Sequence, residues 1–249
     1  MTNDDGFDAP GITSLYEGLI AAGHNVHIFA PKEQPSALGT TFGGIEQLFG
    51  EDEPDLVISG ADLGPSTGIS ANASAALAAA VQSVFDCGIP AIAVSIGADE
   101  RGQAPEGLYE FGADFTAELV DSLLETAPED GSILPADRGL NVNIPVGADR
   151  EDIAFTLLDE ATALHIGVER VPVPGNDEFY RFDFAGPVTI DNPLSEGTNF
   201  VDGSITITPV DGNHTADLAT TLAVADLLDL TFGNPTVFGA GQSDMLFMA

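Results

Sequence analysis

The 249-residue chain has little sulfur and no long apolar run. Its one cysteine, Cys87, excludes an internal disulfide. No apolar stretch reaches the roughly 20 residues that a membrane-crossing helix needs. The first residues, Met-Thr-Asn-Asp-Asp, are acidic where a secretory signal would be basic. We therefore expect a cytoplasmic protein that does not associate with membranes.

Positive charge is equally scarce. Six lysines and arginines stand against 40 acidic residues, which gives a formal net charge of −34. Duplex nucleic acid is excluded as a partner, because binding its phosphates needs patches of lysine and arginine. The acids are scattered along a chain that is 44% hydrophobic, so neither an acidic tail nor a disordered acidic chain is indicated. This pattern favours a folded protein kept soluble in high salt, where screening weakens the repulsion between carboxylates.

The first half of the chain alternates strand and helix patterns. Short, fully apolar runs predict strands at 25–30, 55–59 and 90–96, and helical spacing predicts helices at 12–22, 74–86 and 109–126, with a short helix at 44–49. Apolar strands joined to helices by short connections are typical of a doubly wound, mainly parallel α/β sheet, which has helices on both faces. The fold class predicted is therefore a three-layer α/β protein.

The second half continues the sheet less regularly. We expect strands at 141–144, 155–158 and 205–209, a hairpin within 168–189, a helix at 215–230 and an apolar tail at 231–249. We predict one domain over residues 1–249. Its parts are an α/β half (1–128), the remaining strands, hairpin and helix (129–230), and the tail (231–249).

Polar residues gather in the loops that follow the strands, where open α/β sheets bind ligands. The first loop carries Asn3, Asp4 and Asp5, the second carries Ser36, Gly39 and Thr40, and the third carries Asp62 and leads to Ser74. Carboxylate and hydroxyl oxygens suit Mg²⁺, Mn²⁺ or Ca²⁺. No cysteine or histidine cluster, P-loop or nucleophile elbow competes with this interpretation. Taken alone, however, Asp4-Asp5-Gly6 could equally be a simple turn.

The segment TNDDGFDAPGI, residues 2–12, resembles the amino-terminal signature of the SurE family of survival-protein 5′-nucleotidases. Four more segments are similar to family motifs and follow in the family's order. They are PDLVISGADLGPSTG (54–68), GIPAIAVS (88–95), LNVNIP (140–145) and GTNF followed by ITITPV (197–210).

The resemblance implies an enzyme that hydrolyses nucleoside monophosphates to nucleoside and phosphate. It also implies one Mg²⁺ or Mn²⁺ per subunit and assembly into a homodimer or homotetramer. By motif, Asp4 and Asp5 correspond to catalytic metal ligands, and Ser36 and Asp62 fall at further ligand positions. Ser74 begins the phosphate-contacting segment, and Asn3, Gly39 and Thr40 are expected near the substrate.

The sequence departs from the family pattern in four places. The apolar strand expected before the signature has no counterpart, so either the start lies further upstream or another segment fills its place. The stretch 36–54 is short, Asp62 stands where the family has asparagine, and Ser74-Ala75-Ala76 replaces Ser-Gly-Thr. These changes leave two alternatives open: a phosphatase of another small phosphomonoester, and a divergent relative with little activity.

Overall fold

The computed structural model describes most of the chain before residue 212. The described ranges are 1–32, 53–128, 131–135, 138–172, 179–184 and 186–211. Met1–Gly212 form one compact unit. The helices predicted at 44–49 and 215–230 and the tail at 231–249 lie outside the described residues.

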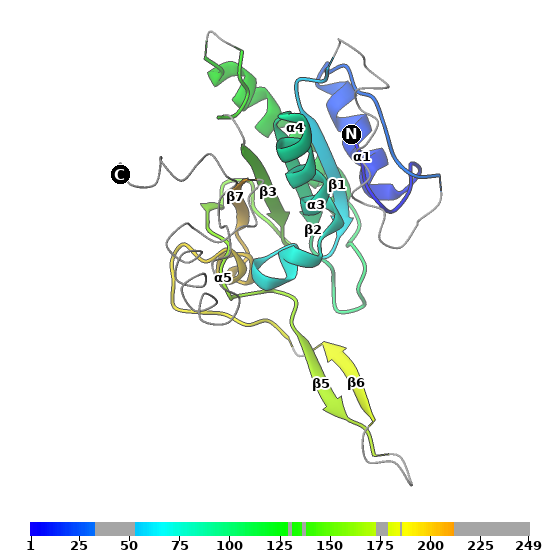
Figure 1. Cartoon of the computed structure of the whole chain (residues 1–249), viewed down its shortest axis with the longest axis vertical. Helices are drawn as coiled ribbons and strands as arrows, with labels where there is room; N and C mark the ends of the chain where they lie inside the picture. Colours follow the sequence, from blue (N-terminus) through cyan, green and yellow to red (C-terminus); the bar gives the residue numbers. More distant parts are fainter. Residues whose placement is uncertain (33–52, 129–130, 136–137, 173–178, 185, 212–249) are drawn as a thin grey trace, which may run out of the picture. The chain divides into compact units, whose positions relative to one another are not determined.

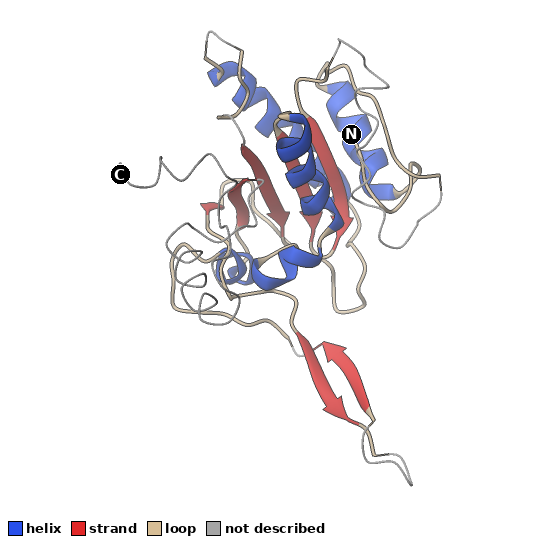
Figure 2. Ribbon diagram, in the orientation of Figure 1, coloured by secondary structure: helices blue, strands red, loops and turns tan. Residues whose placement is uncertain are grey.

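One mixed sheet of five strands forms the centre of this unit (Figures 1 and 2). Its strands, in spatial order, are β1 (Val57–Leu63), β2 (Ala91–Ile96), β3 (Arg138–Ile144), β7 (Ile205–Asp211) and β4 (Ile153–Phe155). The pairs β1–β2, β2–β3 and β4–β7 are parallel, and β3–β7 is antiparallel. The predicted mainly parallel α/β sheet is confirmed.

Helices cover both faces of this sheet. On one face, α1 (Pro10–Ala21) and α4 (Leu108–Thr126) pack against each other and against β1. On the other face, α3 (Ala75–Gln82) packs on β1 and β2 and continues as one π-helical turn, Ser83–Cys87. Separate apolar clusters lie under the two layers of helix, so the predicted three-layer architecture is confirmed.

The alternation of side chains along the strands determines which side chains of the sheet pack against each layer of helices. The side chains of Ile92, Val94 and Ile96 in β2 join the apolar cluster beneath α1 and α4. The intervening Ala91 and Ala93 join the cluster beneath α3, because successive side chains of a strand point to opposite faces. Alanines on this second face let α3, itself alanine-rich, approach the sheet closely.

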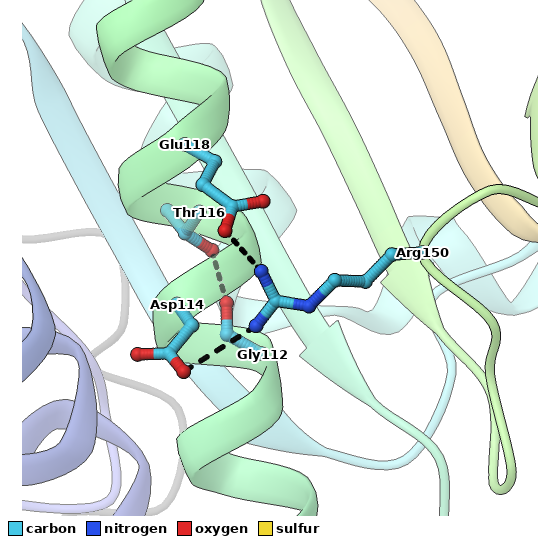
Figure 3. Close-up of polar contacts among 5 residues, drawn as sticks. All are labelled: Gly112, Asp114, Thr116, Glu118 and Arg150. Atoms are coloured by element: carbon cyan, nitrogen blue, oxygen red, sulfur yellow. Dashed lines mark hydrogen bonds and ion pairs between the residues drawn. The ribbon is translucent and has the colours of Figure 1, made fainter.

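An arginine ties α4 to the loop that follows β3 (Figure 3). Arg150 donates hydrogen bonds to Glu118 and, at 3.3 Å, to Asp114, which lie four residues apart on one face of the helix. Its guanidinium also lies 5.1 Å from the centre of the Phe111 ring. Two acids that would repel each other across one turn of α4 thus share one cation.

The segment predicted as a strand at 25–30 is not one, and this prediction is wrong. Within the described ranges its backbone bonds to Met1, through Met1 N–H to His27 O at 2.6 Å and Phe29 N–H to Met1 O at 2.8 Å. A groove of about 650 Å³ is lined by this segment and by the start of β1, with apolar side chains that include Val26, Leu56 and Ile58. These two hydrogen bonds do not make a ladder along 25–30, so the segment is not a strand.

The later elements agree with the sequence in part. The predicted hairpin is present as β5 (Ile166–Arg170) paired with β6 (Tyr180–Phe184) in a two-stranded sheet. The strand predicted at 155–158 lies earlier, in β4, and the short helix α5 (Glu196–Asp202) was not predicted. None of the described helices combines the length and apolar content that crossing a membrane requires.

Candidate metal centre

Asp4 and Asp5 stand in a tight turn that leaves the edge of β1. Just before them, Thr2 pairs with this edge, its N–H donating to Ile58 O and its carbonyl accepting from Gly60 N–H, both at 2.9 Å. The turn closes on itself, because Asn3 Nδ2 donates to Gly6 O and Gly6 N–H donates to Asn3 Oδ1. Gly6 has a φ of +118°, a conformation that side-chain-bearing residues rarely adopt. The two aspartates are thereby fixed where the turn passes the sheet.

Asp62 reaches the same place from β1 itself. It lies in the last part of the strand, beside Ser95 of β2. Its Oδ2 accepts a hydrogen bond from Ala76 N–H in the first turn of α3, at 3.0 Å. Its Oδ1 is buried and has no hydrogen-bond partner in the part of the chain that the structure describes. A buried acceptor without a partner costs about 1–3 kcal/mol, so this oxygen is suited to a ligand.

The three carboxyl groups converge. One oxygen from each of Asp4, Asp5 and Asp62 lies within 4.8 Å of the other two, and all three residues are half-buried. Carboxylates this close repel one another, and a divalent cation removes that repulsion. An all-oxygen donor set with one unsatisfied buried oxygen fits a hard ion such as Mg²⁺ or Mn²⁺.

The pKa values around the cluster reflect the same repulsion between carboxylates. Burial, followed by the charges of Asp4 and Asp5, raises the pKa of Asp62 to about 7, against the lowering effect of the Ala76 N–H. Tyr109, in the first turn of α4, also responds to the cluster. Burial raises the pKa of its phenol, and the negative charges of Asp5 and Asp62 raise it further. Tyr109 is thus a neighbour of the site that the sequence alone did not indicate.

Ser74 sits at the entrance to α3. Its Oγ accepts the N–H of Leu77 at 3.1 Å, which makes it the N-cap of the helix. The same oxygen accepts a 2.7 Å hydrogen bond from Ser66 Oγ. Two of the first N–H groups of α3 thus bond to Ser74 and Asp62, and the predicted phosphate contact and the predicted metal ligand meet at one helix end.

Comparisons with known proteins agree with this geometry. The family model described as Survival protein SurE matches residues 1–43 and 41–163. The chain belongs to the SurE family.

Three relatives of this SurE chain are named 5′-nucleotidase SurE. The one from Solidesulfovibrio magneticus is 30% identical over 241 residues, which cover 84% of this chain and 89% of the relative. The one from Desulfitobacterium hafniense strain DCB-2 is 30% identical over 249 residues, covering 86% and 91%. The one from Desulforamulus reducens is 27% identical over 242 residues, covering 84% and 90%.

A solved structure shares the fold. The SurE protein from Aquifex aeolicus superposes with a TM-score of 0.73, at 24% identity, over 92% of this chain and 98% of that one. The agreement extends the sheet-and-helix architecture described above to a known member of the family.

The sequence-predicted site residues of this SurE chain fall into three groups. Asp4, Asp5 and Asp62 are brought together, and Ser74 lies at the helix end that holds Asp62. Asn3 is 5% exposed and bonds Gly6 of its own turn through both polar atoms of its side chain. The remaining predicted residues, Ser36, Gly39 and Thr40, lie outside the described residues.

Sequence reasoning missed a buried polar layer next to the site. On the α3 face of the sheet, the apolar surface gives way to polar side chains near the carboxyl ends of β2 and β3. These buried residues are Ser95, Asn141, Asn143, Thr206 and Thr208, and Glu196 of α5 lies among them. A signal was present in the sequence, because Asn141 and Asn143 occupy alternate positions of an otherwise apolar strand.

Proposed function

We propose that this chain is a divalent-metal-dependent 5′-nucleotidase, which cleaves the phosphate ester of a nucleoside monophosphate. The observation that supports it most strongly is the convergence of Asp4, Asp5 and Asp62 within 4.8 Å of one another. The names of the relatives supply the reaction class, since 5′-nucleotidases are phosphoric monoester hydrolases.

The residues present fit a metal ion. Asp4, Asp5 and Asp62 would hold it, with Ser36 as a fourth proposed ligand, and we favour Mg²⁺ or Mn²⁺. When bound, the ion neutralises charge on the phosphate oxygens, which this acidic protein would otherwise repel. Because Ala76 N–H engages Oδ2 of Asp62, the unpartnered Oδ1 is the oxygen left for the ion.

The chain's own groups perform the remaining tasks. We propose that either Asp4 or Asp5 orients the attacking water and accepts its proton, as a carboxylate within reach of water can. Ser74 Oγ accepts hydrogen bonds from Ser66 Oγ and Leu77 N–H, so we propose that it donates its own hydroxyl proton to a phosphate oxygen. The Asp62 carboxylate, which replaces the family's asparagine, strengthens metal binding and weakens the approach of phosphate.

The test is hydrolysis of nucleoside monophosphates in high salt with Mg²⁺ or Mn²⁺. Asp5→Asn removes a proposed ligand, and we expect it to reduce kcat/KM by at least 100-fold. Asp8→Asn is the matched control, because Asp8 is exposed on the same loop and does not belong to the cluster. Equal activity of Asp5→Asn and the parent would show that the metal assignment is wrong.

A substrate panel separates the alternatives. We expect nucleoside 5′-monophosphates to give a higher kcat/KM than sugar phosphates or p-nitrophenyl phosphate. A preference for a sugar phosphate would support a phosphatase with a different substrate, which the short 36–54 segment favours. Turnover of none of these esters, with Mn²⁺ bound, would support a divergent relative with little activity.

A further inference from the structure

Glu196 is the most deeply buried acidic group described, with no exposed surface. It opens α5 and has no part in the metal centre. Four groups donate hydrogen bonds to its carboxylate. Oε1 accepts from Asn141 Nδ2 at 2.8 Å, Asn143 Nδ2 at 3.3 Å and Thr208 Oγ1 at 2.7 Å, and Oε2 accepts from Gly68 N–H at 3.1 Å.

The two asparagines connect this carboxylate to the loop that joins Asp62 to α3. Both backbone polar groups of Ser66 bind the asparagine side chains. Its N–H donates to Asn143 Oδ1 at 2.6 Å, and its carbonyl accepts from Asn141 Nδ2 at 2.8 Å. Because each Asn Nδ2 also donates to Glu196, the carboxylate fixes which way both amides point.

Gly68 shows how closely the loop is held. A Cβ at this position would lie 1.6 Å from the carbonyl oxygen of Ala161, and its φ is +51°. Only glycine allows the backbone to come this near, and the approach brings its N–H to Glu196. The loop is thus held at residues 66 and 68 by groups from β3 and α5.

The side chain of Ser66 connects the 66–68 loop to the start of α3. Ser66 Oγ contacts Ser95 Oγ at 2.8 Å and donates to Ser74 Oγ at 2.7 Å. Ser74 caps α3, whose Ala76 N–H binds Asp62. A continuous line of hydrogen bonds therefore runs from the buried carboxylate to the end of α3 beside the three aspartates.

We propose that Glu196 is a positioning residue for phosphate binding: with Asn141 and Asn143 it holds the 66–68 loop so that Ser74 and the first turn of α3 stand beside Asp62. This inference rests on the proposed function, because it assumes that the phosphate binds at Ser74. It also explains why an acid is buried in this layer. Burial raises the pKa of Glu196 to about 7, while the bonds from Thr208, Gly68 and Asn141 lower it and the charge of Asp159 raises it slightly.

The test variant is Glu196→Gln. Its amide has only one oxygen, which the three donors at Oε1 require, so its NH₂ group faces Gly68 N–H and the bond to the loop is lost. The matched control is Thr206→Val. Thr206 is as fully buried as Glu196 and lies on the same face of β7 as Thr208. Its Oγ1 has no hydrogen-bond partner among the described residues.

Three quantities are measured in high salt: Mn²⁺ affinity by electron paramagnetic resonance, binding of inorganic phosphate to the Mn²⁺-loaded protein by calorimetry, and kcat and KM for a nucleoside monophosphate. We expect Glu196→Gln to raise the phosphate Kd and the KM about tenfold. Its Mn²⁺ affinity should stay within twofold of the parent, and Thr206→Val should match the parent in all three.

A phosphate Kd within twofold of the parent in Glu196→Gln would overturn the inference, and so would equal losses of phosphate and Mn²⁺ binding, which indicate general damage. If this variant does not fold, Ser66→Ala decides instead. It removes the link to Ser74, leaves the carboxylate untouched, and should raise the phosphate Kd about threefold, so an unchanged Kd would overturn the inference.

The two proposals can fail separately. A parent that hydrolyses nucleotides normally while Glu196→Gln behaves identically would remove only the positioning role. A parent that binds phosphate with Mn²⁺ but hydrolyses no nucleotide would remove the nucleotidase, and the phosphate Kd would still decide on Glu196. A parent that binds no phosphate would overturn the inference directly.

Discussion

The half-buried Asp62 and the fully buried Glu196 are two acids beside the same loop, and desolvation by burial is the largest cause that raises the pKa of each to about 7. Their surroundings are opposite. Asp62 faces two further acids, accepts a backbone hydrogen bond from Ala76, and keeps a buried oxygen that has no partner among the described residues. Glu196 accepts four hydrogen bonds through its two oxygens, from three side chains and one backbone N–H.

The difference teaches how to distinguish a carboxylate that binds a ligand from one that holds the fold. A similar pKa does not separate them, because burial is the largest contribution in both. The hydrogen-bond inventory does. Four donors already satisfy the two oxygens of Glu196, whereas Asp62 has two acids beside it and one oxygen without a partner among the described residues.

Removing the two carboxyl groups gives the largest contrast in stability. In metal-free protein, Glu196→Ala removes four hydrogen bonds, those from Gly68, Asn141, Asn143 and Thr208, and we expect a loss of roughly 3 kcal/mol or more. Asp62→Ala loses one backbone contact but relieves like-charge repulsion, so we expect a change within about 1 kcal/mol. Urea unfolding with a chelator at constant salt measures both free energies. Equal losses would erase the distinction between the two groups.

Adding Mn²⁺ tests the proposed role of Asp62 as a metal ligand. At a hundredfold excess over its Kd, Mn²⁺ should stabilise the parent by about 2.7 kcal/mol, because it binds only the folded state. Asp62→Asn keeps an oxygen but loses a charge. With a tenfold weaker Kd, the same Mn²⁺ concentration should give about half this stabilisation.

Glu196→Gln is the control for this measurement, since its Mn²⁺ site is intact. Thermal or urea unfolding with and without Mn²⁺ should show the full increment in this variant. If Asp62→Asn kept the full increment while Glu196→Gln lost it, the assignment of the two acids would have to be reversed.

The pH dependence gives the smallest effect. Because the pKa of Glu196 is raised from 4.5 to about 7, the folded protein holds a proton that the unfolded chain has released between these values. This contribution to stability is complete below pH 4.5 and is lost as the pH rises through 7. The slope is at most about 1.4 kcal/mol per pH unit for one group.

Comparison with Glu196→Gln separates the contribution of Glu196 to the pH slope of the unfolding free energy from that of the many surface acids, which both proteins share. In metal-free protein between pH 5 and 8, the free energy of unfolding of the parent should fall more steeply than that of the variant. Parallel pH curves for the two proteins would mean that Glu196 ionises at the same pH in the folded and unfolded states.

The core of the fold could be predicted because its signals are local. Short runs rich in apolar residues at 55–59, 90–96 and 141–144 mark strands covered on both faces, and all three are present in the sheet. The segment 25–30 has the same appearance but is not a strand. A strand needs a neighbour, and the composition of one segment does not reveal whether another lies beside it.

The site could be predicted in part for a related reason. Asp4 and Asp5 lie in a turn beside β1 and Asp62 lies near the carboxyl end of β1, so the topology of the sheet brings them together. Glu196 reaches the site through tertiary packing, and α5 spans only seven residues, too few for a clear helical period. Its partner Gly68 is 128 residues away in the sequence. Only Asn141 and Asn143, polar within an apolar strand, indicated that something polar covers them.

That separation also sets an order of events on the ribosome. At about 5–20 residues per second, Gly68 emerges roughly 6 to 25 s before Glu196. Asn141 and Asn143 emerge between the two, so the 66–68 loop and both asparagines precede the carboxylate that they bond. The hydrogen bonds that hold this loop can therefore be completed only after translation has passed residue 196.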